Sequence, residues 1–209
     1  MNTIELLKEQ KAVYVKNLVS QDLLKFFTNV LMRHSVSFMN SDLRMFDVQV
    51  PTAVSVMCRE TQSELMFETL LESLWPTMEE IVGEELIPTY AYARLYTNGD
   101  YLEKHTDRPA CEISVTVQLG RSHHYAWPIY MGGNRVDMAE GDAVVYKGCE
   151  IEHWRNVCSG PDGYYSGQVF LHYVRVNGPY AAEHGCDATM RTLVKNMFVK
   201  NRTILMDSK

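Results

Sequence analysis

Residues 86–176 have a sequence pattern that restricts the choice of fold class. Short runs rich in Val, Ile, Tyr and Thr recur there, broken by turn sequences such as "TNGD", "DRPA", "MGGN" and "SGPDG". Short strands at close spacing are typical of an antiparallel sandwich or barrel. The expected strands are 87–97, 101–106, 111–119, 126–131, 143–147, 151–157 and 166–176.

The residues before this region predict helices with one or two strands. "AVYVKNL" is β-like, and Ser20 is a good N-cap for a helix over 21–34, where apolar residues recur at helical spacing. A second helix is expected over 61–75 with Thr61 as its N-cap, and Pro76 is expected to kink or restart it.

We expect one domain over residues 1–209. It comprises a helical buttress (1–85), a β core (86–176) and a C-terminal extension (177–209) that includes a short helix in "TMRTLVKNMFVKN". The fold class is therefore mainly β with flanking helices (α+β).

Composition excludes several classes of function. The net charge of −6 and the absence of a basic run argue against nucleic-acid binding. No stretch reaches the length of a membrane span, and the first residues lack the apolar core of a signal peptide. Five cysteines without a CxxC pair indicate reduced thiols, so a cytoplasmic location is expected.

His105 and Asp107 are the first candidates for a metal site. Residues i and i+2 of a strand point to the same face, so the imidazole and the carboxylate converge without unusual backbone. His153, in a later strand-like run, offers a third ligand. Two imidazoles and one carboxylate with open positions suit non-haem Fe(II). For the HxD pair alone, a surface histidine beside a turn-capping aspartate is the competing interpretation.

Four segments together resemble Fe(II)/2-oxoglutarate-dependent dioxygenases of the prolyl-4-hydroxylase-like family: "YARLYTNGDYLEKHTDRPACEISVTVQL", "WPIY", "EGDAVVYKGCEIEHWRNV" and "QVFLHYV". The resemblance covers roughly residues 86–176 and implies a double-stranded β-helix, a jelly-roll or cupin-like barrel. It implies His105, Asp107 and His153 as iron ligands. It also implies Fe(II) and 2-oxoglutarate as cofactor and co-substrate, with ascorbate as a candidate addition.

The family holds the distal carboxylate of 2-oxoglutarate with a Lys or Arg, usually on the last barrel strand, and this chain has no basic residue near that place. We expect Arg155 to substitute, because it lies two residues after His153 and so faces the same interior. Arg94 and Lys147 are the alternative candidates for this role. A structural salt bridge of Arg155 to Glu150, Glu152 or Asp107 is the alternative.

Four further residues are candidate co-substrate contacts. Tyr96 stands where the family often has an aromatic hydrogen-bonding group, although a plain barrel aromatic is the alternative. Ser114, Thr116 and Gln118 alternate with apolar residues and are expected to line the cavity, unless they form a solvent-exposed sheet face.

Three other histidines and two tryptophans have structural explanations. We expect His123 and His124 at the surface and His172 in the core. Trp127 and Trp154 are expected as core or cavity wall.

The resemblance implies hydroxylation of a small-molecule or peptide substrate with release of succinate and CO2. A peptidyl prolyl residue, another amino-acid side chain and a small metabolite all remain open. Two alternatives are a cupin-like module that binds a metal without catalysis and an oxygen-using iron enzyme that needs no 2-oxoglutarate.

Overall fold

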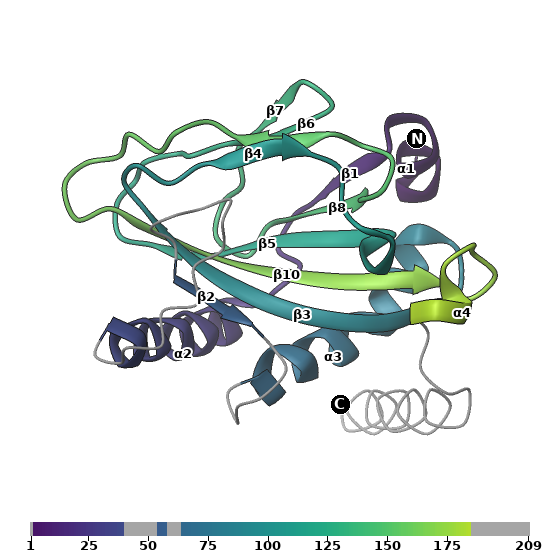
Figure 1. Cartoon of the computed structure of the whole chain (residues 1–209), viewed down its shortest axis with the longest axis horizontal. Helices are drawn as coiled ribbons and strands as arrows, with labels where there is room; N and C mark the ends of the chain where they lie inside the picture. Colours follow the sequence, from purple (N-terminus) through teal and green to yellow (C-terminus); the bar gives the residue numbers. More distant parts are fainter. Residues whose placement is uncertain (1, 40–53, 58–63, 185–209) are drawn as a thin grey trace, which may run out of the picture.

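A computed structural model describes residues 2–39, 54–57 and 64–184. Two antiparallel sheets face each other, and helices cover the outer face of the larger sheet (Figure 1). The expected N-cap Thr61 and the expected helix over 189–201 lie outside the described residues.

The larger sheet has the strand order β1-β8-β5-β10-β3-β2. Its strands are β1 (Ala12–Val15), β2 (Val54–Met57), β3 (Leu86–Thr97), β5 (Ile113–Arg121), β8 (Ala143–Lys147) and β10 (Tyr165–Arg175). The smaller sheet has the order β4-β9-β6-β7. Its strands are β4 (Leu102–His105), β6 (Ile129–Met131), β7 (Asn134–Val136) and β9 (His153–Arg155). This is the predicted jelly roll, and all seven expected strands are present. The short strands β2 and β7 add to them.

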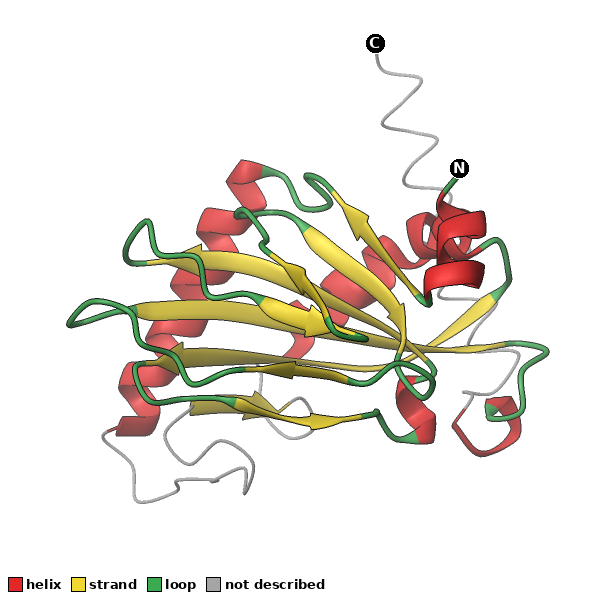
Figure 2. Ribbon diagram, turned by 90° about the horizontal axis from the view of Figure 1, so that it is seen from above, coloured by secondary structure: helices red, strands yellow, loops and turns green. Residues whose placement is uncertain are grey.

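The helices are α1 (Thr3–Gln10), α2 (Gln21–Met39), α3 (Glu64–Val82) and α4 (Ala181–His184), with a 3-10 turn at Pro109–Cys111. α2 and α3 lie against the larger sheet, on the side away from the smaller sheet (Figures 1 and 2). α3 runs through Pro76 as one helix and does not restart there. The buried Trp75 anchors this part of α3, because its indole Nε1 donates to the carbonyl of Leu86 on β3 over 2.9 Å.

Alternation along the strands sorts side chains between two layers. Val115 and Val117 of β5 and Leu171 of β10 are fully buried in the apolar cluster that α2 and α3 complete. Gly120 permits this close packing, because a Cβ there would lie 2.8 Å from the side chain of Thr28 on α2. The opposite face of the same strands is buried and polar, and it points toward the smaller sheet.

None of the helices within the described residues combines the length and apolar character that a membrane crossing requires.

Replacing Leu171 with Ala tests this layer arrangement. The side chain is fully buried between β10 and the helices, so the substitution leaves a cavity and is expected to cost about 2–5 kcal/mol of unfolding free energy. Urea denaturation measures the loss. Leu23→Ala on α2 is the matched control, because Leu23 is 47% exposed and its loss should cost less than about 1 kcal/mol. Equal effects of the two variants would contradict the assignment of layers.

Candidate metal centre

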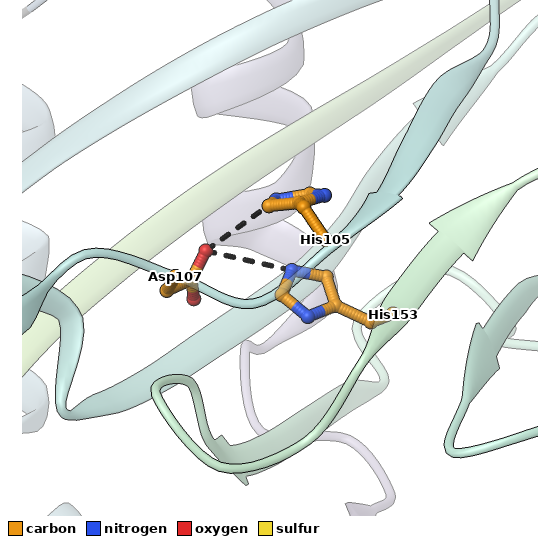
Figure 3. Close-up of side chains that lie close together, drawn as sticks. All are labelled: His105, Asp107 and His153. Atoms are coloured by element: carbon orange, nitrogen blue, oxygen red, sulfur yellow. Dashed lines mark ion pairs between the residues drawn. The ribbon is translucent and has the colours of Figure 1, made fainter.

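Three predicted ligands converge between the two sheets. His105 ends β4, His153 begins β9, and the antiparallel register places them directly opposite each other. Their ring centroids lie 4.3 Å apart. Asp107 follows β4 by two residues and points at both rings (Figure 3).

The distances fit a single small cation. The Oδ1 atom of Asp107 lies 3.6 Å from Nε2 of His105 and 3.5 Å from Nε2 of His153. Ligands at about 2.1 Å from a metal, on adjacent corners of an octahedron, are about 3 Å apart. A small contraction would therefore bring all three atoms onto one ion.

The backbone fixes which nitrogen of each imidazole faces the centre. Nδ1 of His105 lies 2.7 Å from the carbonyl of Glu103, and Nδ1 of His153 lies 3.1 Å from the carbonyl of Ile151. Because a carbonyl only accepts hydrogen bonds, each Nδ1 carries the proton and donates it. In the neutral form of each ring, Nε2 then has the lone pair with which imidazole binds metals.

The carboxylate is charged in this environment. Burial alone would raise the pKa of Asp107, but contacts with the two imidazoles hold this pKa well below its usual range. The contact with Asp107 in turn raises the pKa of His105. The side chain of Asp107 is only 13% exposed and that of His153 only 3%, so the donors lie at the edge of a largely dry interior.

Arg155 is the most deeply buried cation beside this centre. It is 1% exposed, and burial lowers the pKa of its guanidinium. Nη1 donates to the carbonyl of Trp127 over 2.6 Å, and the guanidinium lies over the Trp127 ring. Its Nε and Nη2 atoms have no hydrogen-bond partner within the described part of the chain.

The salt bridge considered for Arg155 does not form with the nearby exposed carboxylates. Glu150 pairs with Lys11 and Lys147, and Glu152 pairs with Lys104 over 2.8 Å.

Arg94 and Lys147, the two alternative candidates for the distal carboxylate, differ in position. Arg94 lies on the interior face of β3, is 6% exposed and places its guanidinium 5.3 Å from the centre of the Tyr92 ring. Lys147 is the residue after Tyr146 on β8. Since Tyr146 packs 4.8 Å from the ring of His153, strand alternation directs Lys147 to the other face.

The polar residues of β5 are buried, as expected, and each has protein partners. Thr116 donates to Gln168 on β10 over 3.4 Å. Gln118 donates to Ser166 over 3.1 Å. Ser114 donates to Oδ2 of Asp107 over 2.8 Å. The need of these buried groups for hydrogen-bond partners is therefore met within the protein, without a ligand.

Tyr96 is fully buried on β3, in a cluster with Trp127 and Phe170. Its hydroxyl accepts a long hydrogen bond from Arg94 over 3.5 Å.

His123 and His124 are exposed, as predicted. Trp127 is in the core, but Trp154 alternates with His153 and lies on the outer face of the smaller sheet, stacked on Tyr130. That outer face carries a groove of about 480 Å³ lined in part by Lys104, Glu152 and Trp154, separated from the His/Asp cluster by the sheet itself.

His172 lies in the core, as predicted. Burial lowers its pKa to about 4, so it is neutral. Together with Asp107 and Cys111 it forms a second group of possible metal donors within 4.8 Å of one another. Ser114 already engages Oδ2 of Asp107 and Nδ1 of His172 in this second group. The Nε2 atoms of His105 and His153 instead face Oδ1 of Asp107, so the cluster of His105, Asp107 and His153 is the better metal centre.

The comparisons with known proteins agree with this geometry at the level of fold. No known family model matches the sequence, and no curated protein matches it. Among solved structures, EctD from S. alaskensis, with 2-oxoglutarate and 5-hydroxyectoine, superposes with a TM-score of 0.67 at 13% identity, over 90% of this chain and 85% of that one.

Two more structures are similar over most of their length. A 2OG-Fe(II) oxygenase family oxidoreductase from Burkholderia pseudomallei gives a TM-score of 0.61 at 17% identity, covering 84% of this chain and 91% of that one. A prolyl-4-hydroxylase from Pseudomonas putida gives 0.59 at 13% identity, covering 83% and 97%. The chain has the double-stranded β-helix fold of the 2OG-Fe(II) oxygenases. The predicted fold class and the suspected resemblance are confirmed.

Single substitutions test the centre directly. His105→Ala, Asp107→Ala and His153→Ala each remove one of three converging donors, so each is expected to weaken binding of Co²⁺ by more than about 100-fold. Isothermal titration calorimetry measures the affinity. Glu152→Gln is the matched control, because Glu152 neighbours His153 but pairs with Lys104 on the outer face. Unchanged affinity in His153→Ala would exclude this centre.

Proposed function

We propose that this protein is an Fe(II)- and 2-oxoglutarate-dependent oxygenase that hydroxylates a small-molecule or peptide substrate and releases succinate and CO2. The main support for this proposal is that two Nε2 atoms and one carboxylate oxygen converge on one point of a double-stranded β-helix. Fe(II) bound there would supply the oxygen-activating chemistry, which amino-acid side chains lack.

The donor set fits such an ion. Two neutral imidazoles and one carboxylate offset half of the charge of Fe(II) and leave room for an anionic co-ligand. The rival interpretation, a closed structural metal site, requires a fourth protein ligand. The donor group around His105, Asp107 and His153 has three members among the described residues, which favours an open site.

Arg155 is our choice for the distal carboxylate of 2-oxoglutarate. A fully buried guanidinium with two nitrogens lacking partners within the described residues is costly, and a carboxylate accepting both hydrogen bonds would remove that cost. Arg155 lies in β9 two residues after His153, so its side chain is on the same face of the strand as this proposed metal ligand. Tyr96 neighbours it through Trp127 and is proposed to complete the wall of this subsite. Contacts of 2-oxoglutarate with Ser114, Thr116 and Gln118 stay a prediction.

The protein residues would hold the metal ligands in position and exclude water from the site. The imidazoles are oriented by backbone carbonyls, and Asp107 is kept ionised, so the site is arranged before any ligand enters. Tyr146 packs on the ring of His153, and Trp127, in contact with Tyr96, packs on the guanidinium of Arg155, so aromatic surface borders both parts of the site.

Proteins that share this fold differ in their substrates and in the reactions that they catalyse. One similar structure is a prolyl hydroxylase in complex with a hypoxia inducible factor peptide fragment from Trichoplax adhaerens, and another, SnoN, is described as a non-heme alpha ketoglutarate dependent epimerase. Three protein ligands leave three octahedral positions, enough for a chelating keto acid and oxygen in either reaction. We propose hydroxylation because prolyl hydroxylases are among the similar structures and the carboxylate of Asp107 occupies the position that a halide would need.

Turnover of 2-oxoglutarate tests the proposal. Purified protein with Fe(II), ascorbate and 2-oxoglutarate is expected to form succinate slowly even without a substrate, and His105→Ala is expected to form none. Oxygen consumption that needs iron but no 2-oxoglutarate would instead support the oxygenase class that does not use this co-substrate. Absence of both activities would leave a binding module.

Replacing Arg155 with Gln tests the co-substrate site. Loss of a buried charged partner costs about 2 kcal/mol or more, so KM for 2-oxoglutarate should rise by about 30-fold or more. The variant should also lose the preference for 2-oxoglutarate over a 2-oxo acid without a distal carboxylate, such as pyruvate. Arg135→Gln, an exposed arginine paired with Asp137, is the control.

Arg94→Gln separates the two buried arginines. If this variant loses the preference for 2-oxoglutarate and Arg155→Gln keeps it, the assignment of the distal carboxylate to Arg155 is wrong.

A further inference from the structure

The hydroxyl of Ser114 lies behind Asp107, within hydrogen-bonding distance of several polar groups. Its Oγ atom is 2.8 Å from Oδ2 of Asp107, 3.0 Å from Nδ1 of His172 and 3.0 Å from the carbonyl of Cys111. Ser114 is fully buried and His172 is 2% exposed, so water does not compete for these bonds.

Counting protons gives the direction of each bond. A serine hydroxyl has one proton, and among the acceptors around it, which include the hydroxyl of Tyr146, the ionised carboxylate is the strongest. Ser114 therefore donates to Asp107. Nδ1 of His172 must then carry a proton and donate to the serine oxygen, which forms the chain His172 to Ser114 to Asp107.

Gly148 closes the other side of this carboxylate. Its carbonyl accepts the backbone N–H of Asp107 over 2.8 Å. A Cβ atom at this position would lie 2.5 Å from Oδ2 of Asp107, 2.8 Å from Oγ of Ser114 and 2.2 Å from the carbonyl oxygen of Cys111. Only glycine leaves room for the carboxylate and the serine to meet.

The two oxygens of Asp107 thus have different surroundings. Oδ1 faces both imidazoles, at 3.5 and 3.6 Å, while Oδ2 is occupied by Ser114 and backed by Gly148. A carboxylate with both oxygens free binds a metal through one or both of them.

We propose that Ser114, held by His172, is a positioning residue that restricts Asp107 to binding metal through Oδ1 alone. This inference rests on the proposed function, because it concerns the metal that function requires. Binding through one oxygen keeps three octahedral positions open, whereas binding through both would occupy one of them. The chain of hydrogen bonds would therefore keep open the coordination position that oxygen or the keto acid needs.

The experiment compares Co²⁺ binding in four variants. Ser114→Ala removes the donor to Oδ2, and His172→Phe removes the donor to Ser114 while keeping an aromatic ring between Tyr90 and Tyr92. His172→Asn retains an N–H close to the position of Nδ1. Ser166→Ala is the matched control, since Ser166 is a buried serine on β10 that hydrogen-bonds Gln118 and Gln168 and not Asp107.

Two readouts separate positioning from a merely structural role: the dissociation constant for Co²⁺ and the visible absorption spectrum of the Co²⁺-loaded protein, which reports coordination number. Ser114→Ala is expected to bind Co²⁺ about 10- to 100-fold more weakly, with an altered spectrum. His172→Phe should change both in the same direction, and His172→Asn should restore the wild-type spectrum. Ser166→Ala should match the wild type in both readouts.

A Ser114→Ala variant with the wild-type affinity and spectrum overturns the inference, whatever its thermal stability measured by circular dichroism. Loss of stability without a spectral change overturns it as well, because Ser114 would then serve only the packing of the fold. If the wild-type protein itself binds no Co²⁺, the proposed function fails first, so the two failures are distinguishable.

Discussion

The site depends on the antiparallel pairing of β4 with β9. This pairing sets His105 directly opposite His153 across two strands that are nearly fifty residues apart in the chain. Each strand is short, and the two imidazoles meet only because their register is correct. A slip by one residue would send one of them to the outer face, where Lys104 and Glu152 now pair.

The larger sheet serves as the platform for this pairing. One face of β3, β5 and β10 is apolar and packs on α2 and α3, and the other face is buried and polar. Polar groups on that inner face bond to one another and to Asp107, so they fix the positions of side chains near the centre. Arg155 is buried as well, and two of its nitrogens have no hydrogen-bond partner among the residues that the structure describes. We propose that they bind the distal carboxylate of 2-oxoglutarate.

Much of this arrangement could be predicted from residues alone. Strand alternation predicted that Ser114, Thr116 and Gln118 share one face and that His105 and Asp107 converge, and turn residues located the strands to within a few positions. The partner of Ser114 could not be predicted, because it depends on where the loop of Asp107 crosses the sheet. The role of Gly148 is equally hidden, since it is a matter of space between three segments. The two extra strands β2 and β7 are too short to give a pattern, and the continuation of α3 through Pro76 reflects tertiary packing around Trp75, which overrides local propensity.

A crystal structure of the Fe(II)-loaded protein, with the metal located by anomalous diffraction at the iron edge, would show whether His105, Asp107 and His153 bind one ion. We expect one ion about 2.0–2.2 Å from Nε2 of His105, Nε2 of His153 and Oδ1 of Asp107, with Oδ2 still hydrogen-bonded to Ser114. An ion on Cys111 and His172, or one that His153 does not reach, would contradict this expectation.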